Sequence, residues 1–94
     1  MFIYKIDLMK ALKDKEYGPG RIRTEKIMGE HTLQKIRTGE MIGINALDTV
    51  CRLLDMQPGS IIEYMPRDRV EALIEGGYFK NHDLPTPVIK EEDK

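Results

Sequence analysis

The sequence contains one cysteine, no tryptophan and no long apolar run. The single thiol, Cys51, excludes an intramolecular disulfide and a cysteine-rich zinc site. No apolar stretch approaches the roughly 18 residues that a membrane-spanning helix needs, and no apolar signal segment follows Met1. These absences predict a soluble, cytoplasmic protein that does not contact a membrane.

Groups that could carry out catalysis are also scarce. The only histidines are His31 and His82. No glycine-rich phosphate loop follows a predicted strand, and no His, Cys or Asp spacing is typical of a metal site. Because an enzyme needs a convergent set of such groups, the sequence predicts no catalytic residues, no cofactor and no metal.

Charge is nearly balanced overall but unevenly distributed. The formal net charge is −1, yet residues 10–38 carry eight Lys or Arg against four Asp or Glu. Residues 39–66 carry one Arg against four acids, and residues 67–94 carry five bases against seven acids. One end of the fold is therefore expected to be basic, which orients a protein towards phosphate without making it basic overall.

The apolar periodicity predicts a mainly α domain with a minor two-stranded β-sheet. The expected elements are a strand over 2–6, helices over 8–15, 21–26 and 29–38, a helix carrying Leu47, Val50, Cys51 and Leu54, a turn of helix from Pro58, and a strand over 61–65. Asp7 is expected to cap the first helix, and Gly39 to close the helix over 29–38. Asn45, with Asp48 three residues later, resembles a capping box.

A C-terminal extension follows, with a helix predicted over 67–75. Its apolar residues Val70, Leu73 and Ile74 have two interpretations, packing on the domain or contact with a second copy. Because proline-rich, charged termini bury little surface, the chain from Lys80 onward is expected to be a flexible tail.

Two stretches carry a resemblance to a known family. Residues 32–40 read TLQKIRTGE, and residues 47–64 read LDTVCRLLDMQPGSIIEY. In these stretches the chain resembles the short bacterial branch of the Cro/repressor-type (XRE-like) helix-turn-helix transcriptional regulators. The resemblance covers about residues 1–66 and leaves residues 67–94 outside it.

The resemblance implies a five-helix, repressor-like DNA-binding domain over residues 1–66. Its helix-turn-helix would place the helix over 29–38 in the major groove of double-stranded DNA. A homodimer would act as a transcriptional regulator, and the expected role is that of a repressor. The alternative is a protein-interaction module of the antitoxin or anti-repressor type, with little affinity for DNA. The sequence does not identify a small-molecule effector.

Helix geometry and the resemblance together select the candidate DNA-binding residues. With Leu33 and Ile36 facing inward, the outer face of the helix carries His31, Gln34, Lys35 and Thr38. Gln34 and Lys35 are candidates for reading base edges, while His31 and Thr38 could contact phosphate or only water. Glu30 could accept from a cytosine amino group or favour the helix N-terminus. The candidates for phosphate contact are Arg21, Arg23, Lys26 and Arg37.

Each of these assignments has a simpler alternative interpretation. The outer residues could form an ordinary solvated helix face, and Arg23 or Arg37 could pair with Glu25 or Glu40. The chain also departs from the family at two positions. Arg23 stands where a small residue is usual, and Ile27 stands where the turn usually has glycine. Because a β-branched residue disfavours positive φ, the turn is expected to be built differently, with Gly29 in the left-handed conformation.

Overall fold

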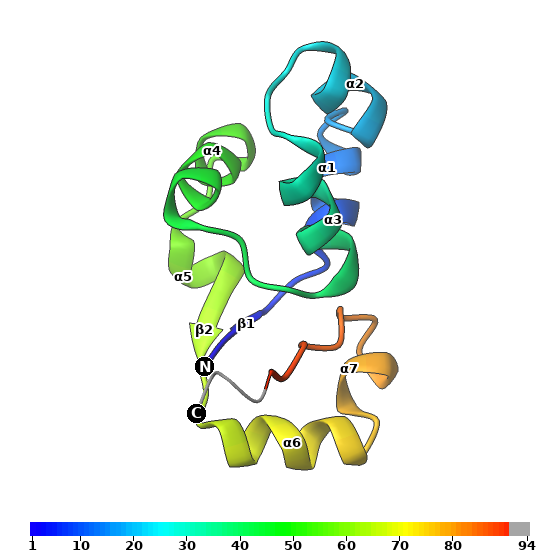
Figure 1. The fold of residues 1–94 in the computed structure, drawn as a ribbon, viewed down its shortest axis with the longest axis vertical. Helices are drawn as coiled ribbons and strands as arrows, with labels where there is room; N and C mark the ends of the chain where they lie inside the picture. Colours follow the sequence, from blue (N-terminus) through cyan, green and yellow to red (C-terminus); the bar gives the residue numbers. More distant parts are fainter. Residues whose placement is uncertain (91–94) are drawn as a thin grey trace.

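The computed structural model describes residues 1–90, which form seven helices and one two-stranded sheet. The elements are β1 (Phe2–Tyr4), α1 (Leu8–Asp14), α2 (Pro19–Thr24), α3 (Glu30–Thr38), α4 (Ile44–Leu54), α5 (Pro58–Ile61), β2 (Ile62–Tyr64), α6 (Arg67–Glu75) and α7 (Tyr78–Asn81). In Figure 1, α1–α3 occupy one end of the molecule with α4 and α5 beside them, and α6 and α7 occupy the other end. The mainly α architecture, with five helices before β2, confirms the predicted fold class.

The sheet lies between two apolar clusters. β1 and β2 pair antiparallel with Phe2 opposite Tyr64, which confirms the predicted pairing. Because successive side chains of a strand point to opposite faces, Ile3 and Tyr4 enter different clusters. Tyr4 joins the main core built by α1–α5, whereas Ile3 joins a second cluster with Val70 of α6. The sheet therefore connects the N-terminal domain to the C-terminal extension.

The apolar face of α6 is used within the chain. Val70 is fully buried beside Ile3 and Phe79, and Leu73 and Ile74 pack against the same cluster. The predicted bounds of α6 are confirmed. Helix α7 was not predicted, because its four residues are too few to show a helical period.

The chain beyond α7, which we expected to be flexible, packs against the fold as far as Lys90. Leu84 and Ile89 join the second cluster, and Pro87 is buried. Lys90 forms an ion pair with Glu40, the residue that follows Gly39 at the end of α3. We call residues 84–90 the C-terminal segment. The remaining part of the predicted tail, residues 91–94, lies outside the described residues.

The helix caps confirm one prediction and correct another. Asp7 caps α1, because its carboxylate accepts from the Lys10 N–H at 3.1 Å. Asn45 does not cap α4. The N-cap is Gly43, which is extended and makes no side-chain cap bond, so Asn45 lies within the first turn and no capping box with Asp48 forms. The prediction was wrong because the extended backbone conformation that an N-cap requires falls at Gly43, with φ −72° and ψ 170°, and Asn45 is already inside the helix.

Tyr4 gives the core a measurable pH dependence. Burial raises the pKa of the Tyr4 phenol from 10.0 to about 12, with a smaller contribution from the charge of Glu40. Because the folded-state pKa is raised, this stability is fully present below pH 10 and is lost as pH rises through 12. At about 1.4 kcal/mol per pKa unit, the full loss should be about 3 kcal/mol, of which about 2 kcal/mol falls between pH 10 and 12. Urea unfolding between pH 10 and 12 measures it, and Tyr4→Phe should show a correspondingly smaller pH dependence. Equal slopes for the two proteins would contradict this assignment.

Candidate nucleic-acid interface

The turn between α2 and α3 is built around Lys26. Lys26 adopts a left-handed conformation with φ 55°, and its N–H donates to the Arg23 carbonyl oxygen at 3.2 Å. The Ile27 N–H donates to the Ile22 carbonyl oxygen at 3.0 Å. Ile22 is buried in the main core, and Ile27 packs against that core. These two bonds and the apolar contact form a Schellman motif, a common way to end a helix.

This geometry corrects the prediction for Gly29. Its φ is −75°, so it is not left-handed, and it serves as the N-cap of α3. The positive φ falls one residue before Ile27, and the β-branched side chain is therefore not strained. The departure from the usual glycine at this turn is thus compensated by Lys26, while Ile27 supplies an apolar anchor.

Helix α3 is buried on one face and exposed on the opposite face. Leu33 and Ile36 are buried in the main core, as predicted. On the opposite face His31 and Gln34 are exposed and Lys35 is half-buried. Thr38 is exposed too, but its hydroxyl donates to the Gln34 carbonyl oxygen at 3.0 Å. The helix therefore presents a short polar face that the core keeps in a fixed orientation.

Arg23 and Glu30 form a bridge between α2 and α3. The guanidinium of Arg23 donates to both carboxylate oxygens of Glu30, at 2.6 and 2.8 Å. This hydrogen bonding holds the pKa of the Glu30 carboxyl below its usual range, and the charge of Arg37 acts in the same direction. Such a bidentate pair fixes geometry as well as charge. The pairing with Glu30 explains why the long side chain of Arg23 can replace the small residue that is usual at this position. Its guanidinium links α2 to α3.

The remaining basic candidates differ in how they are held. Arg21 pairs with Glu25 at 2.8 Å, and its guanidinium lies over the Tyr17 ring, 4.4 Å from the centroid. Hydrogen bonding to Glu25 raises the pKa of Arg21 further above its ordinary value. Lys26 and Arg37 are exposed, and neither forms an ion pair within residues 1–90. Of the four basic candidates on α2, α3 and the turn between them, two are therefore already paired with acids.

The C-terminal segment reaches the end of α3, which the sequence did not indicate. A pocket of about 280 Å³ is lined by Lys35 and Gly39 together with Val88 and Lys90. The available signal was the stretch LPTPVI at residues 84–89, where apolar residues flank two prolines, since a proline-rich stretch favours an extended conformation. The segment therefore lies beside the half-buried Lys35 at the end of α3.

No group of three or more His, Cys, Asp and Glu side chains is placed to hold a metal ion among residues 1–90. Over the same residues, no helix is long and apolar enough to cross a membrane.

Comparison with known proteins identifies one relationship. Neither the curated proteins nor the solved structures contain a match to this chain. The family model of the Cro/C1-type HTH DNA-binding domain matches residues 8–67, which include α1–α5 and β2. The match covers most of the chain, and the protein therefore belongs to this family of DNA-binding transcription regulators.

Proposed function

We infer that this protein binds specific duplex DNA sequences as a homodimeric transcriptional repressor acting in the cytoplasm. Residues 1–66 would contact DNA, and residues 67–94 would form an extension. The observation that carries the proposal is the outer face of α3, where Gln34 and His31 are exposed while Leu33 and Ile36 anchor the helix from behind. A helix presented in this way can enter the major groove without rearrangement of the core.

The proposed contacts divide between bases and phosphates. Gln34 and Lys35 would read base edges, because glutamine matches adenine and lysine matches guanine. His31 and Thr38 would extend that face towards either base or backbone. Arg21, Lys26 and Arg37 would neutralise phosphates, which supplies most of the binding energy. Arg23 would contribute through its bridge to Glu30, by setting the orientation of α3 relative to α2.

One observation favours the alternative function, a protein-interaction module of the antitoxin or anti-repressor type. Glu25 and Glu30 neutralise Arg21 and Arg23 in the free protein, and the net charge is −1. Both features weaken non-specific attraction to phosphate.

Selection of bound sequences from random duplex DNA separates the two functions, since an enriched motif requires base readout. A reporter gene placed under that motif then tests repression.

Two substitutions test the division of contacts. Gln34→Ala should weaken binding to the preferred site by about 1–3 kcal/mol and leave non-specific binding nearly unchanged. Arg21→Ala should weaken both kinds of binding and lower the slope of log affinity against log salt by about one. Fluorescence anisotropy over a salt series measures both effects, after circular dichroism has established that each variant folds.

Arg69→Ala is the matched control for charge. Arg69 is exposed on α6, at the opposite end of the molecule from α2 (Figure 1), so the same charge is removed outside the proposed interface. Equal losses for Arg21→Ala and Arg69→Ala would show that only total charge matters. Equal losses of specific and non-specific affinity in Gln34→Ala would show that α3 contacts the backbone alone.

A further inference from the structure

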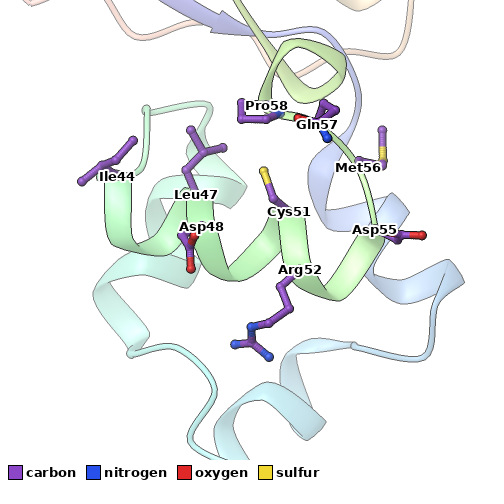
Figure 2. A pocket seen from close by; sticks show the side chains of 9 residues that line it. All are labelled: Ile44, Leu47, Asp48, Cys51, Arg52, Asp55, Met56, Gln57 and Pro58. Carbon is purple, nitrogen blue, oxygen red and sulfur yellow. The ribbon is translucent and has the colours of Figure 1, made fainter.

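Two surface pockets differ in what they place beside the proposed DNA-binding face. One, of about 490 Å³, lies between α4 and the start of α5, where Figure 2 shows Cys51 pointing from α4 towards Pro58. None of the candidate DNA-binding residues lines that pocket. The other, of about 280 Å³, lies at the end of α3, and Lys35, Glu40 and Lys90 are among its lining residues. The second pocket therefore places an acid and a base from outside α3 beside a proposed base-reading residue.

The backbone of Glu40 is held on both sides. Its N–H donates to the Lys35 carbonyl oxygen at 2.9 Å. Its carbonyl oxygen accepts from the hydroxyl of Tyr4 at 2.8 Å, and Tyr4 is buried in the main core. Because these bonds fix the main chain at the end of α3, a change of partner by Glu40 requires only its side chain to move.

The carboxylate of Glu40 lies within reach of more than one positive charge. It forms an ion pair with Lys90 of the C-terminal segment. Hydrogen bonding from Lys90 holds the pKa of the Glu40 carboxyl below its usual range, and the charges of Lys35 and His31 on α3 act in the same direction. Lys35 itself forms no ion pair within residues 1–90. The acid is thus paired with the base of the C-terminal segment, and the base of α3 is left without an acidic partner in this part of the chain.

We propose that Lys90 is a positioning residue for DNA readout, because its ion pair with Glu40 keeps that carboxylate from neutralising Lys35. Without Lys90, the carboxylate would turn to Lys35, which would have to leave it before contacting a guanine. The side chains of Glu40 and Lys90 are 29% and 40% exposed. Ion pairs between such partly exposed groups change an equilibrium constant by up to about fivefold. The inference rests on the proposed role of Lys35, but the exchange of partners by Glu40 can be measured in the free protein.

Carbon-13 NMR titration of the Glu40 carboxyl tests this exchange without DNA. Lys90→Ala should raise the pKa of Glu40, because the hydrogen bond from Lys90 is lost. Lys35→Ala should raise it more in the Lys90→Ala chain than in the wild-type chain, because Lys35 becomes the main partner only when Lys90 is absent. Lys90→Arg keeps the positive charge and should leave the pKa low. An equal effect of Lys35→Ala in the two backgrounds would overturn the proposal.

Affinity for the preferred DNA site tests the consequence for readout. Lys90→Ala should weaken specific binding by about twofold to fivefold, and most of this loss should disappear in chains that carry Lys35→Ala or Glu40→Gln. A purely structural role of Lys90 would instead weaken binding in those chains as well, because Gln34 on the same helix would also be displaced. Independent losses for Lys90→Ala and Lys35→Ala would therefore overturn the proposal.

Arg69→Ala is again the matched control for charge. It removes one positive charge from α6, outside the pocket at the end of α3, and its effect on binding should be the same with and without Lys35→Ala. If Lys90→Ala behaved in the same way, Lys90 would contribute only total charge. A wild-type protein without any preferred DNA site would contradict the proposed function itself, and with it this role of Lys90.

Discussion

Leu54→Ala should lower the free energy of unfolding by about 2–5 kcal/mol. Leu54 is 4% exposed on the last turn of α4 and belongs to the main core. Removing its side chain forfeits transfer energy and leaves a cavity that the packed helices can fill only in part. For a domain of this size the midpoint of thermal unfolding should fall by about 8 °C or more. Urea and thermal unfolding at low protein concentration measure the change.

The control for this experiment lies on the same helix. Asn45 is exposed in the first turn of α4 and makes no capping bond with its side chain, so Asn45→Ala should change stability by about 0.5 kcal/mol or less. If Asn45 were the N-cap that its sequence context indicates, alanine would cost about 1 kcal/mol. A small effect at Asn45 beside a large one at Leu54 would separate packing from capping in α4.

The apolar periodicity and the residues that end helices were sufficient to predict most of the fold. The core-facing positions Leu33, Ile36, Leu47, Val50 and Leu54 are all buried, because each recurs at helical spacing within a helix of at least nine residues. The strand pairing could be predicted as well, since both strands are rich in β-forming residues and lie at the two ends of one domain. These features depend on local sequence, which the chain displays directly.

The features that could not be predicted depend on contacts between distant residues. The bridge from Arg23 to Glu30 spans seven positions and crosses a turn whose shape was unknown. The left-handed residue was expected at Gly29 by intrinsic preference, but hydrogen bonds to Ile22 and Arg23 selected Lys26 instead. The sequence alone does not show which backbone N–H and C=O groups will form hydrogen bonds within a turn.

The C-terminal segment shows the same limit on a larger scale. Its prolines and charges are typical of a solvated tail, yet Pro87 is buried and Leu84 and Ile89 complete the second cluster. That cluster includes Ile3 of β1, which is far away in sequence. A composition-based prediction has no access to such a partner. The candidate DNA-binding residues remain a prediction, and their test is the pair of Gln34 and Arg21 substitutions.

Gly39→Ala is expected to be the other strongly destabilising substitution. Gly39 ends α3 in the left-handed conformation at φ 83°. A Cβ at this position would lie 2.2 Å from the carbonyl oxygen of Thr86 in the C-terminal segment, well inside contact distance. Alanine therefore costs about 1–2 kcal/mol for the left-handed backbone and about 1–3 kcal/mol more for the displaced segment.

Truncation separates these two contributions. In a chain ending at residue 83, Thr86 is absent, and Gly39→Ala should cost only the backbone contribution of about 1–2 kcal/mol. The difference between the two backgrounds is the coupling between Gly39 and the C-terminal segment. Gly20→Ala is the matched control, because Gly20 lies within α2 with nothing within 4 Å of its Cβ position. That substitution should stabilise the protein by about 0.4–1 kcal/mol. Urea unfolding of the full and truncated chains, each with and without Gly39→Ala, gives the coupling. An equal cost of Gly39→Ala in the full and truncated chains would show that the C-terminal segment does not contact the end of α3.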